Sequence, residues 1–244
     1  MRRMISPLGI ATSCALVLGA CATQQNGSQP AQNDPHQVVA AAYHNTVNAK
    51  TAKITLTTDA NENGKVVHSV GTGVMQFNPV ELDLTTQISG HSSEVRTING
   101  ATYLQARDDK WLKVNTGEFP GGSSPDQALG YLQGASDSIT PAGSATINGQ
   151  QTTGYQVVVD LDKVAAEQST PQAKQSIQQV ETLTGSKTLP VHVWVDSHGR
   201  LVREQDSSTV SSQGHNITTQ TTLDFTDFGT PVAVVTPPAD QITS

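Results

Sequence analysis

The chain has 244 residues and a formal net charge of −7, from 14 Lys and Arg against 21 Asp and Glu. An acidic chain with only 14% charged residues is a poor counter-ion for phosphate, which argues against a nucleic-acid partner. Hydrophobic residues make up 35% of the chain, which is enough for a core and argues against wholesale disorder. The 30 threonines favour β-structure, because Thr fits a pleated, half-buried surface.

Residues 1–20 have the pattern of a bacterial secretory signal. Arg2 and Arg3 precede an apolar stretch over 5–18, which is shorter than the roughly 20 residues that span a bilayer core. Leu-Gly-Ala-Cys at 18–21 then has the form of a lipobox, in which the cysteine thiol receives diacylglycerol. We therefore expect lipidation of Cys21; the alternative is an ordinary signal peptide followed by a chance cysteine.

Once the signal is cleaved, Cys14 is lost with it and the remaining chain has no thiol besides Cys21. Residues 22–33 are small or polar without periodicity, as in a flexible tether, so 21–33 would join the lipid to one domain over 34–244. We expect the protein on the extracytoplasmic face of the cell membrane, attached to it through Cys21.

The domain is expected to open with a helix over 34–49, since Asp34 is a good N-cap and Pro35 fits the first turn. Further helices are expected over 125–133 and 162–183, the second broken at Thr170-Pro171. Gly71 and Gly73 suggest a β-bulge or sharp coiling of their strand. Alternation and turn residues predict strands near 54–60, 66–77, 80–88, 92–98, 101–107, 110–114, 144–147, 152–161, 187–196, 200–211 and 215–228.

These elements predict a mostly β (α+β) fold: a single coiled antiparallel sheet of about eleven strands that forms a half-barrel around helices. The tail from Thr230 holds three prolines and is expected to run extended.

Three hairpins carry a resemblance to a known family. They are Thr-Tyr-Leu at 102–104 with Trp-Leu-Lys-Val at 111–114, Asn-Gly at 148–149 with Gly-Tyr at 154–155, and Val-Trp-Val-Asp at 193–196 with Gly-Arg-Leu-Val-Arg at 199–203. Together with the lipobox, tether and helix order, the chain over roughly 36–235 resembles the LppX/LprG-type lipoproteins of actinobacteria, whose fold is similar to the LolA/LolB carriers.

The resemblance implies an apolar cavity between sheet and helices that accommodates acyl chains of a lipid or glycolipid. With 4% aromatic residues and many threonines, the cavity here is expected to be small, shallow or more polar. The side chains expected to line it are Ile54, Leu56, Leu82, Leu84, Tyr155, Val157, Val159, Val191, Val193 and Leu223.

The motifs of catalysis and metal binding are missing from the sequence. The seven histidines lack the spacing of a helical metal pair, and the chain has no nucleophile elbow and no Gly-rich phosphate loop. Residues 59–64 imitate the start of a calcium loop, but Val70 stands where the bidentate Glu belongs, so a plain turn is favoured. We expect no enzyme, no cofactor and no bound metal.

Two functions remain open. The first is a membrane-anchored, monomeric lipoprotein that binds or shuttles a lipid or glycolipid in an apolar cavity. The second is a non-enzymatic accessory lipoprotein with a filled core, which docks an envelope partner and has no ligand cavity.

Overall fold

The computed structural model describes residues 34–105, 110–114, 125–132, 135–168, 171–212 and 215–243. The expected signal, Cys21 and the tether lie outside these residues and stay predictions. Residues 33–244 form one compact unit that contains the whole described sheet and its hydrophobic cores, so this unit has what it needs to fold alone. In the described part of the chain, none of the helices combines the length and the apolar character that a membrane crossing requires.

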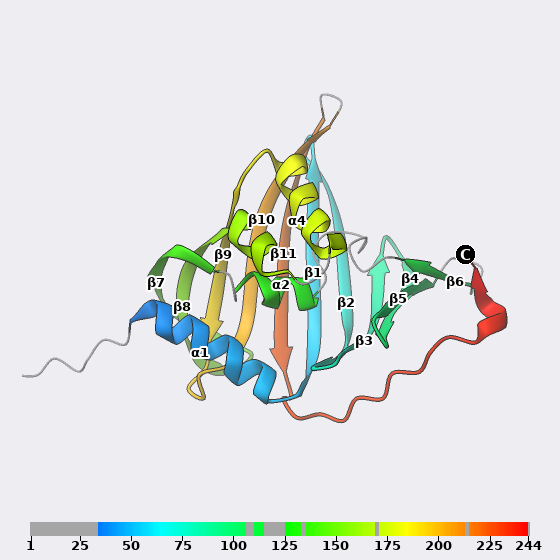
Figure 1. Ribbon diagram of the computed structural model, residues 1–244, viewed down its shortest axis with the longest axis horizontal. Coiled ribbons are helices and arrows are strands. Elements are labelled where there is room, and N and C mark those ends of the chain that lie inside the picture. Colours follow the sequence, from blue (N-terminus) through cyan, green and yellow to red (C-terminus); the bar gives the residue numbers. More distant parts are fainter. Residues whose placement is uncertain are drawn as a thin grey trace, which may run out of the picture. The chain divides into compact units, whose positions relative to one another are not determined.

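One long, curled, open sheet dominates the unit (Figure 1). All neighbouring strands are antiparallel except β12 and β6, and the order across the sheet is β12-β6-β5-β4-β3-β2-β1-β11-β10-β9-β8-β7. The expected fold class is confirmed. Among the described residues the strands are β1 (Thr51–Glu62), β2 (Lys65–Phe77), β3 (Val80–Ile88), β4 (His91–Ile98), β5 (Ala101–Gln105), β6 (Trp111–Val114), β7 (Ala135–Ile147), β8 (Gln150–Asp160), β9 (Thr188–Val195), β10 (Leu201–Ser212), β11 (His215–Thr226) and β12 (Ile242–Thr243).

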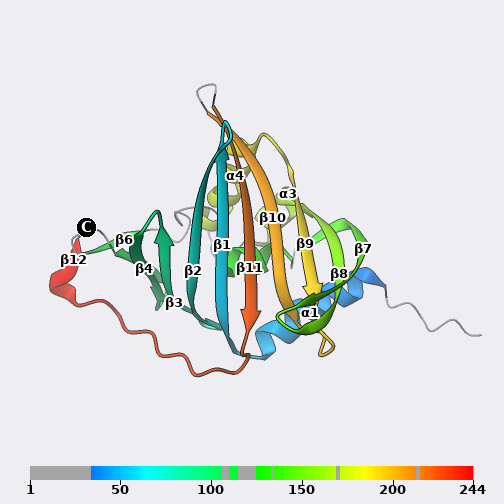
Figure 2. The same ribbon diagram turned by 180° about the vertical axis from the view of Figure 1, so that it is seen from behind.

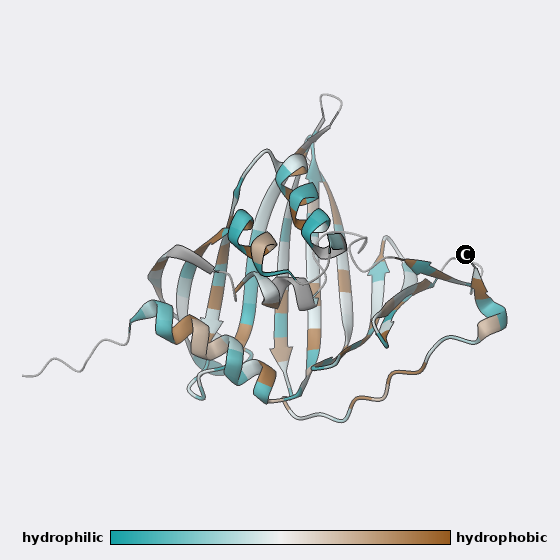
Figure 3. Cartoon of the chain, in the orientation of Figure 1, coloured by the Kyte–Doolittle hydropathy of each residue, from teal (hydrophilic) through white to brown (hydrophobic). Residues whose placement is uncertain are grey.

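The helices lie against one face of the sheet, which we call the helix-covered face; Figure 2 shows the opposite face with the strands in front. These helices are α1 (Pro35–Asn48), α2 (Pro125–Tyr131), α3 (Leu161–Glu167) and α4 (Pro171–Thr184). Hydrophilic residues lie on the outward side of α4 (Figure 3), while its Ile177 is buried. Of the apolar side chains at helical spacing on α4, Ile177 is buried and Val180 is half-buried against the core, whereas Leu183 is exposed.

Helix α1 is capped at its N-terminus and is attached to the sheet near its C-terminus. The Asp34 side chain accepts a hydrogen bond from the His36 amide, as expected for its N-cap. Near the other end, the Thr46 hydroxyl donates to Ala42 O and accepts from the Leu201 amide at 2.8 Å. Asn45 Nδ2 also donates to Gly199 O at 3.0 Å. These bonds hold α1 on the turn between β9 and β10.

Of the two alternatives expected at Gly71 and Gly73, a β-bulge or sharp coiling, the bulge is wrong. The β1–β2 and β2–β3 ladders run through both glycines without a register shift. A Cβ at Gly73 would collide with the backbone oxygen of Asp83, so this glycine allows β2 and β3 to approach closely as the sheet coils. The atoms nearest to a Cβ at Gly71 would be those of the Leu84 side chain, at 3.2 Å.

Gly73→Ala should therefore destabilise the fold by about 1–3 kcal/mol or more, because backbone atoms must move to admit the methyl group. Gly71→Ala should cost clearly less, since the Leu84 side chain can adjust. Urea unfolding of both variants measures the difference. Equal losses at the two glycines would contradict the close approach of β2 and β3.

Two ends of the sheet differ from the expectation. Strand β7 begins at Ala135 rather than near 144, and its pairing with β8 shifts register twice, between Ala135 and Ser138 and between Pro141 and Ser144. The tail was expected to run extended, and it runs from β11 towards β6 without a helix over most of its length (Figure 1). It ends in the two-residue strand β12, which pairs with β6. There Val234 joins Ile98, Tyr103 and Trp111 in a second small core, so the tail covers a sheet edge that would otherwise be exposed.

Candidate functional site

All ten residues that the sequence singled out as a cavity lining belong to one hydrophobic cluster on the helix-covered face. Leu56 is half-buried and the other nine are buried. The register places them in rows across the strands, with Val157 opposite Val191, Tyr155 opposite Val193 and Leu56 opposite Leu223. The structure thus brings these residues together, but whether they contact a lipid stays a prediction.

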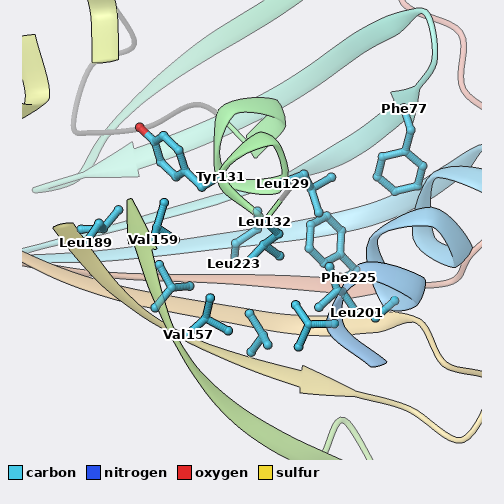
Figure 4. Packing of buried hydrophobic residues seen from close by; sticks show 14 of the residues in the cluster. Phe77, Leu129, Tyr131, Leu132, Val157, Val159, Leu189, Leu201, Leu223 and Phe225 are labelled. Atoms are coloured by element: carbon cyan, nitrogen blue, oxygen red, sulfur yellow. The ribbon is translucent and has the colours of Figure 1, made fainter. Parts of the chain in front are cut away.

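Helix α2 covers the hydrophobic cluster on the helix-covered face of the sheet. Its Leu129, and Leu132 just after its end, point towards the sheet and lie over Leu223 and Phe225 (Figure 4). Leu129 and Leu132 are both buried, as is Tyr131. The cluster is therefore closely filled.

A small pocket remains beside α2. Its volume is about 10 Å³, which is about the space of one water molecule. Its walls come from β1, α2, β10 and β11, and they combine an apolar part with two carboxyl groups. The residues that line it are Leu56, Pro125, Tyr131, Glu204, Asp206, Thr221 and Leu223.

The two carboxyl groups were missed by the sequence reasoning. Glu204 stands opposite Val193 and Leu223, and Asp206 stands opposite Val191 and Thr221, so both lie on the helix-covered face. Glu204 is only 4% exposed, and its Oε2 has no hydrogen-bond partner among the described residues. The available signal was an acidic pair two residues apart in a strand whose neighbours both carry an apolar face.

Burial sets the protonation of this pair. It raises the pKa of Glu204 to about 8, with a smaller contribution from the charge of Asp206. Burial also raises the pKa of Asp206 to about 6, although hydrogen bonds from its backbone and from the Thr221 hydroxyl act in the opposite direction. Near pH 7 Glu204 therefore keeps its proton while Asp206 is mostly ionised.

Arg203 does not neutralise the pair. It lies on the opposite face of β10, where its Nη2 donates to Asp224 Oδ2 at 2.7 Å. Hydrogen bonding to Asp224 raises the pKa of the Arg203 guanidinium, so its positive charge is paired with Asp224. The acidic pair and the nearest arginine in sequence are thus separated by the sheet.

The region that imitates a calcium loop is a hairpin turn. Strand β1 continues to Glu62, and Asn63 and Gly64 make the turn. The Gly64 amide donates to Asn61 Oδ1 at 2.9 Å, and Asp59 Oδ1 lies 2.6 Å from His68 Nδ1. Within the described ranges, no three His, Cys, Asp or Glu side chains gather in a way that could hold a metal ion.

Comparison with solved structures identifies the fold. The chain matches the lipoprotein LppX of Mycobacterium tuberculosis with a TM-score of 0.50 and 15% identity, over 82% of this chain and 99% of that one. It also matches LprF of Mycobacterium bovis with a TM-score of 0.45 and 14% identity, over 83% of this chain and 96% of that one. No family model matches the sequence. No curated protein matches it either.

The likeness to LppX confirms the expected resemblance at the level of the fold. LppX is a lipoprotein, and nearly its whole chain is covered by the match. The sheet with helices on one face is therefore a scaffold that this chain shares with a bacterial lipoprotein.

Proposed function

We propose that this protein is a membrane-anchored envelope lipoprotein that binds or shuttles a lipid or glycolipid between the sheet and its helices. The proposal includes the anchor at Cys21 and a non-enzymatic role. One observation carries it: the helix-covered face, which holds the larger of the two hydrophobic clusters, is closed by separate helices instead of by a second sheet.

Helix α2 is the element that a ligand could replace. It has seven residues, and isolated helices shorter than about 12 residues are marginal in water. Its position therefore depends on the burial of Leu129 and Leu132, which is worth about 1.5–3 kcal/mol for each side chain. An acyl chain offers the sheet the same apolar contacts, so exchanging α2 for a ligand costs little net burial.

The second candidate, an accessory lipoprotein without a ligand cavity, is favoured by the small volume of the pocket, about 10 Å³. Such a protein would keep α2 in place and would act through its surface. The two proposals differ in whether lipid accompanies the purified protein.

Residues 33–244, purified without detergent, should carry lipid in native mass spectrometry and after organic extraction. Leu129→Ala together with Leu132→Ala should increase the lipid-bound fraction, because it weakens the contacts that hold α2 on the sheet. Leu183→Ala on α4 is the matched control, since this leucine is exposed. Lipid-free protein in all three preparations would favour the accessory role.

Cys21→Ser should release the full-length protein from the membrane fraction or leave it as an uncleaved precursor, because serine offers no thiolate to the lipid transferase. Cys14→Ser is the control, because the proposal assigns Cys14 to the discarded signal. Fractionation with metabolic acyl labelling gives the readout. Retention of Cys21→Ser on the membrane with unchanged labelling would refute the lipobox.

A further inference from the structure

The pocket beside α2 contains a buried acceptor that nothing in the described protein satisfies. Glu204 Oε2 is buried without a hydrogen-bond partner, and the Glu204 side chain lines the pocket. Leaving a buried polar atom unpaired costs about 1–3 kcal/mol. Asp206 lines the same pocket, with the Thr221 hydroxyl bonded to its carboxyl group. Two carboxyl groups therefore line the same pocket, and one of their oxygens, Glu204 Oε2, has no hydrogen-bond partner among the described residues.

Near pH 7 the charge of the pair lies mainly on Asp206, and no cation among the described residues acts on it. The charged group that acts on Glu204 is Asp206, which has the same sign. Arg203, their neighbour in sequence, is held by Asp224 on the opposite face. Because a buried charge is stable only when it is paired, the pocket favours a positively charged occupant.

The polar groups of the pocket limit the chemistry of that occupant. A trimethylammonium group has no N–H to donate to the unpaired Oε2 of Glu204, and a phosphate carries charge of the same sign as the carboxylate of Asp206. A calcium ion requires six to eight oxygen ligands, and the two carboxyl groups with Thr221 supply too few. An ammonium group fits, because its three N–H donors can bond to the ionised carboxylate of Asp206 and to the unpaired Oε2 of Glu204.

We propose that Glu204 and Asp206 bind the primary ammonium group of an amine-bearing amphiphile, whose hydrocarbon chain takes the place of α2 on the sheet. This inference rests on the proposed lipid-binding function and names its ligand class. The apolar wall at Leu56 and Leu223 continues directly from the pocket into the large cluster, so head group and chain have adjoining sites.

The test compares three probes that share a dodecyl chain by isothermal titration calorimetry on residues 33–244 at pH 7, each probe kept below its micelle concentration or its solubility limit. The probes are dodecylammonium chloride, dodecyltrimethylammonium chloride and dodecanol. Dodecylammonium should bind at least tenfold more tightly than the other two, since only it offers a charge with N–H donors. Glu204→Gln combined with Asp206→Asn should weaken its binding on the order of tenfold to a hundredfold and leave dodecanol unchanged.

Glu81→Gln is the matched control, because it removes one carboxylate from β3 on the opposite face of the sheet. Thermal unfolding of each variant checks that it is folded. If all three probes bind equally and the double variant changes nothing, the ammonium site is refuted while lipid binding stands. If no probe binds to any variant, the proposed function fails and the ammonium site fails with it.

Discussion

Unfolding of residues 33–244 should become easier as the pH rises from about 5 to about 8, and Glu204→Gln should remove most of that pH dependence. The folded protein holds the Glu204 proton up to a pKa of about 8, whereas the ordinary value is 4.5. Between these values the folded state binds more protons than the unfolded state, so the free energy of unfolding falls with rising pH. Below 4.5 the group is protonated in both states and burial carries no charge penalty.

Above a pH of about 8, the Glu204 carboxyl group is ionised in both the folded and the unfolded state. Burial of its charge then lowers the free energy of unfolding by the full amount, on the order of a few kcal/mol. Asp206 adds to the same trend at lower pH, because burial raises its pKa from 3.8 to about 6. A glutamine side chain in place of Glu204 would carry no charge at any pH, so the variant should lose the part of the slope that belongs to Glu204.

Urea unfolding at pH 5, 6.5 and 8 measures these slopes for the wild type and Glu204→Gln. Glu81→Gln, on the opposite face, should keep the wild-type slope. If Glu204→Gln also keeps it, Glu204 is not the group that holds the extra proton, and the burial of its carboxyl group in solution must differ from the arrangement described.

Val157→Trp and Val193→Trp should each destabilise the protein by about 1–3 kcal/mol or more through overpacking. Both valines are fully buried, at 0% exposure, in the cluster beneath the helices. The pocket beside α2, about 10 Å³ in volume, is far too small for an indole ring. His192→Trp is the matched control, because His192 precedes Val193 on β9 and points to the other face.

Thermal unfolding and lipid extraction of the same three variants give two separate readouts. Unchanged stability of Val157→Trp and Val193→Trp would contradict the filled cluster and would indicate open room on the sheet. A stable variant that also loses its lipid would place the ligand directly over these strands. Destabilised variants together with a lipid-free wild type would favour the accessory role.

Local sequence was sufficient wherever one residue type fixes the backbone or one face of a strand is apolar. Asp34 and Pro35 specify the start of α1 through capping and a fixed φ. Leu82 and Leu84 alternate with Glu81 and Asp83, and the structure buries the leucines as that alternation predicts.

Local sequence was insufficient where the meaning of a residue depends on a strand far away in the chain. Residues 203–209 of β10 are polar on both faces, so alternation cannot say which side is covered. Only the pairing with Val193 and Leu223 turns Glu204 inward. The two-residue strand β12 was missed for a similar reason, because its pairing with β6 lies far along the chain.

The sequence by itself determined the β-rich class, the order of hairpins and helices, and the apolar set that forms the core, because these follow from local periodicity and turn chemistry. Only the tertiary structure decided that Gly73 permits a close approach of strands, that α2 fills the face, and that two carboxyl groups lie beneath it. Each of these depends on which strands pair and in which register. Pairing between distant strands is a property of the whole sheet, because the burial of each side chain is set by its neighbours across the ladder.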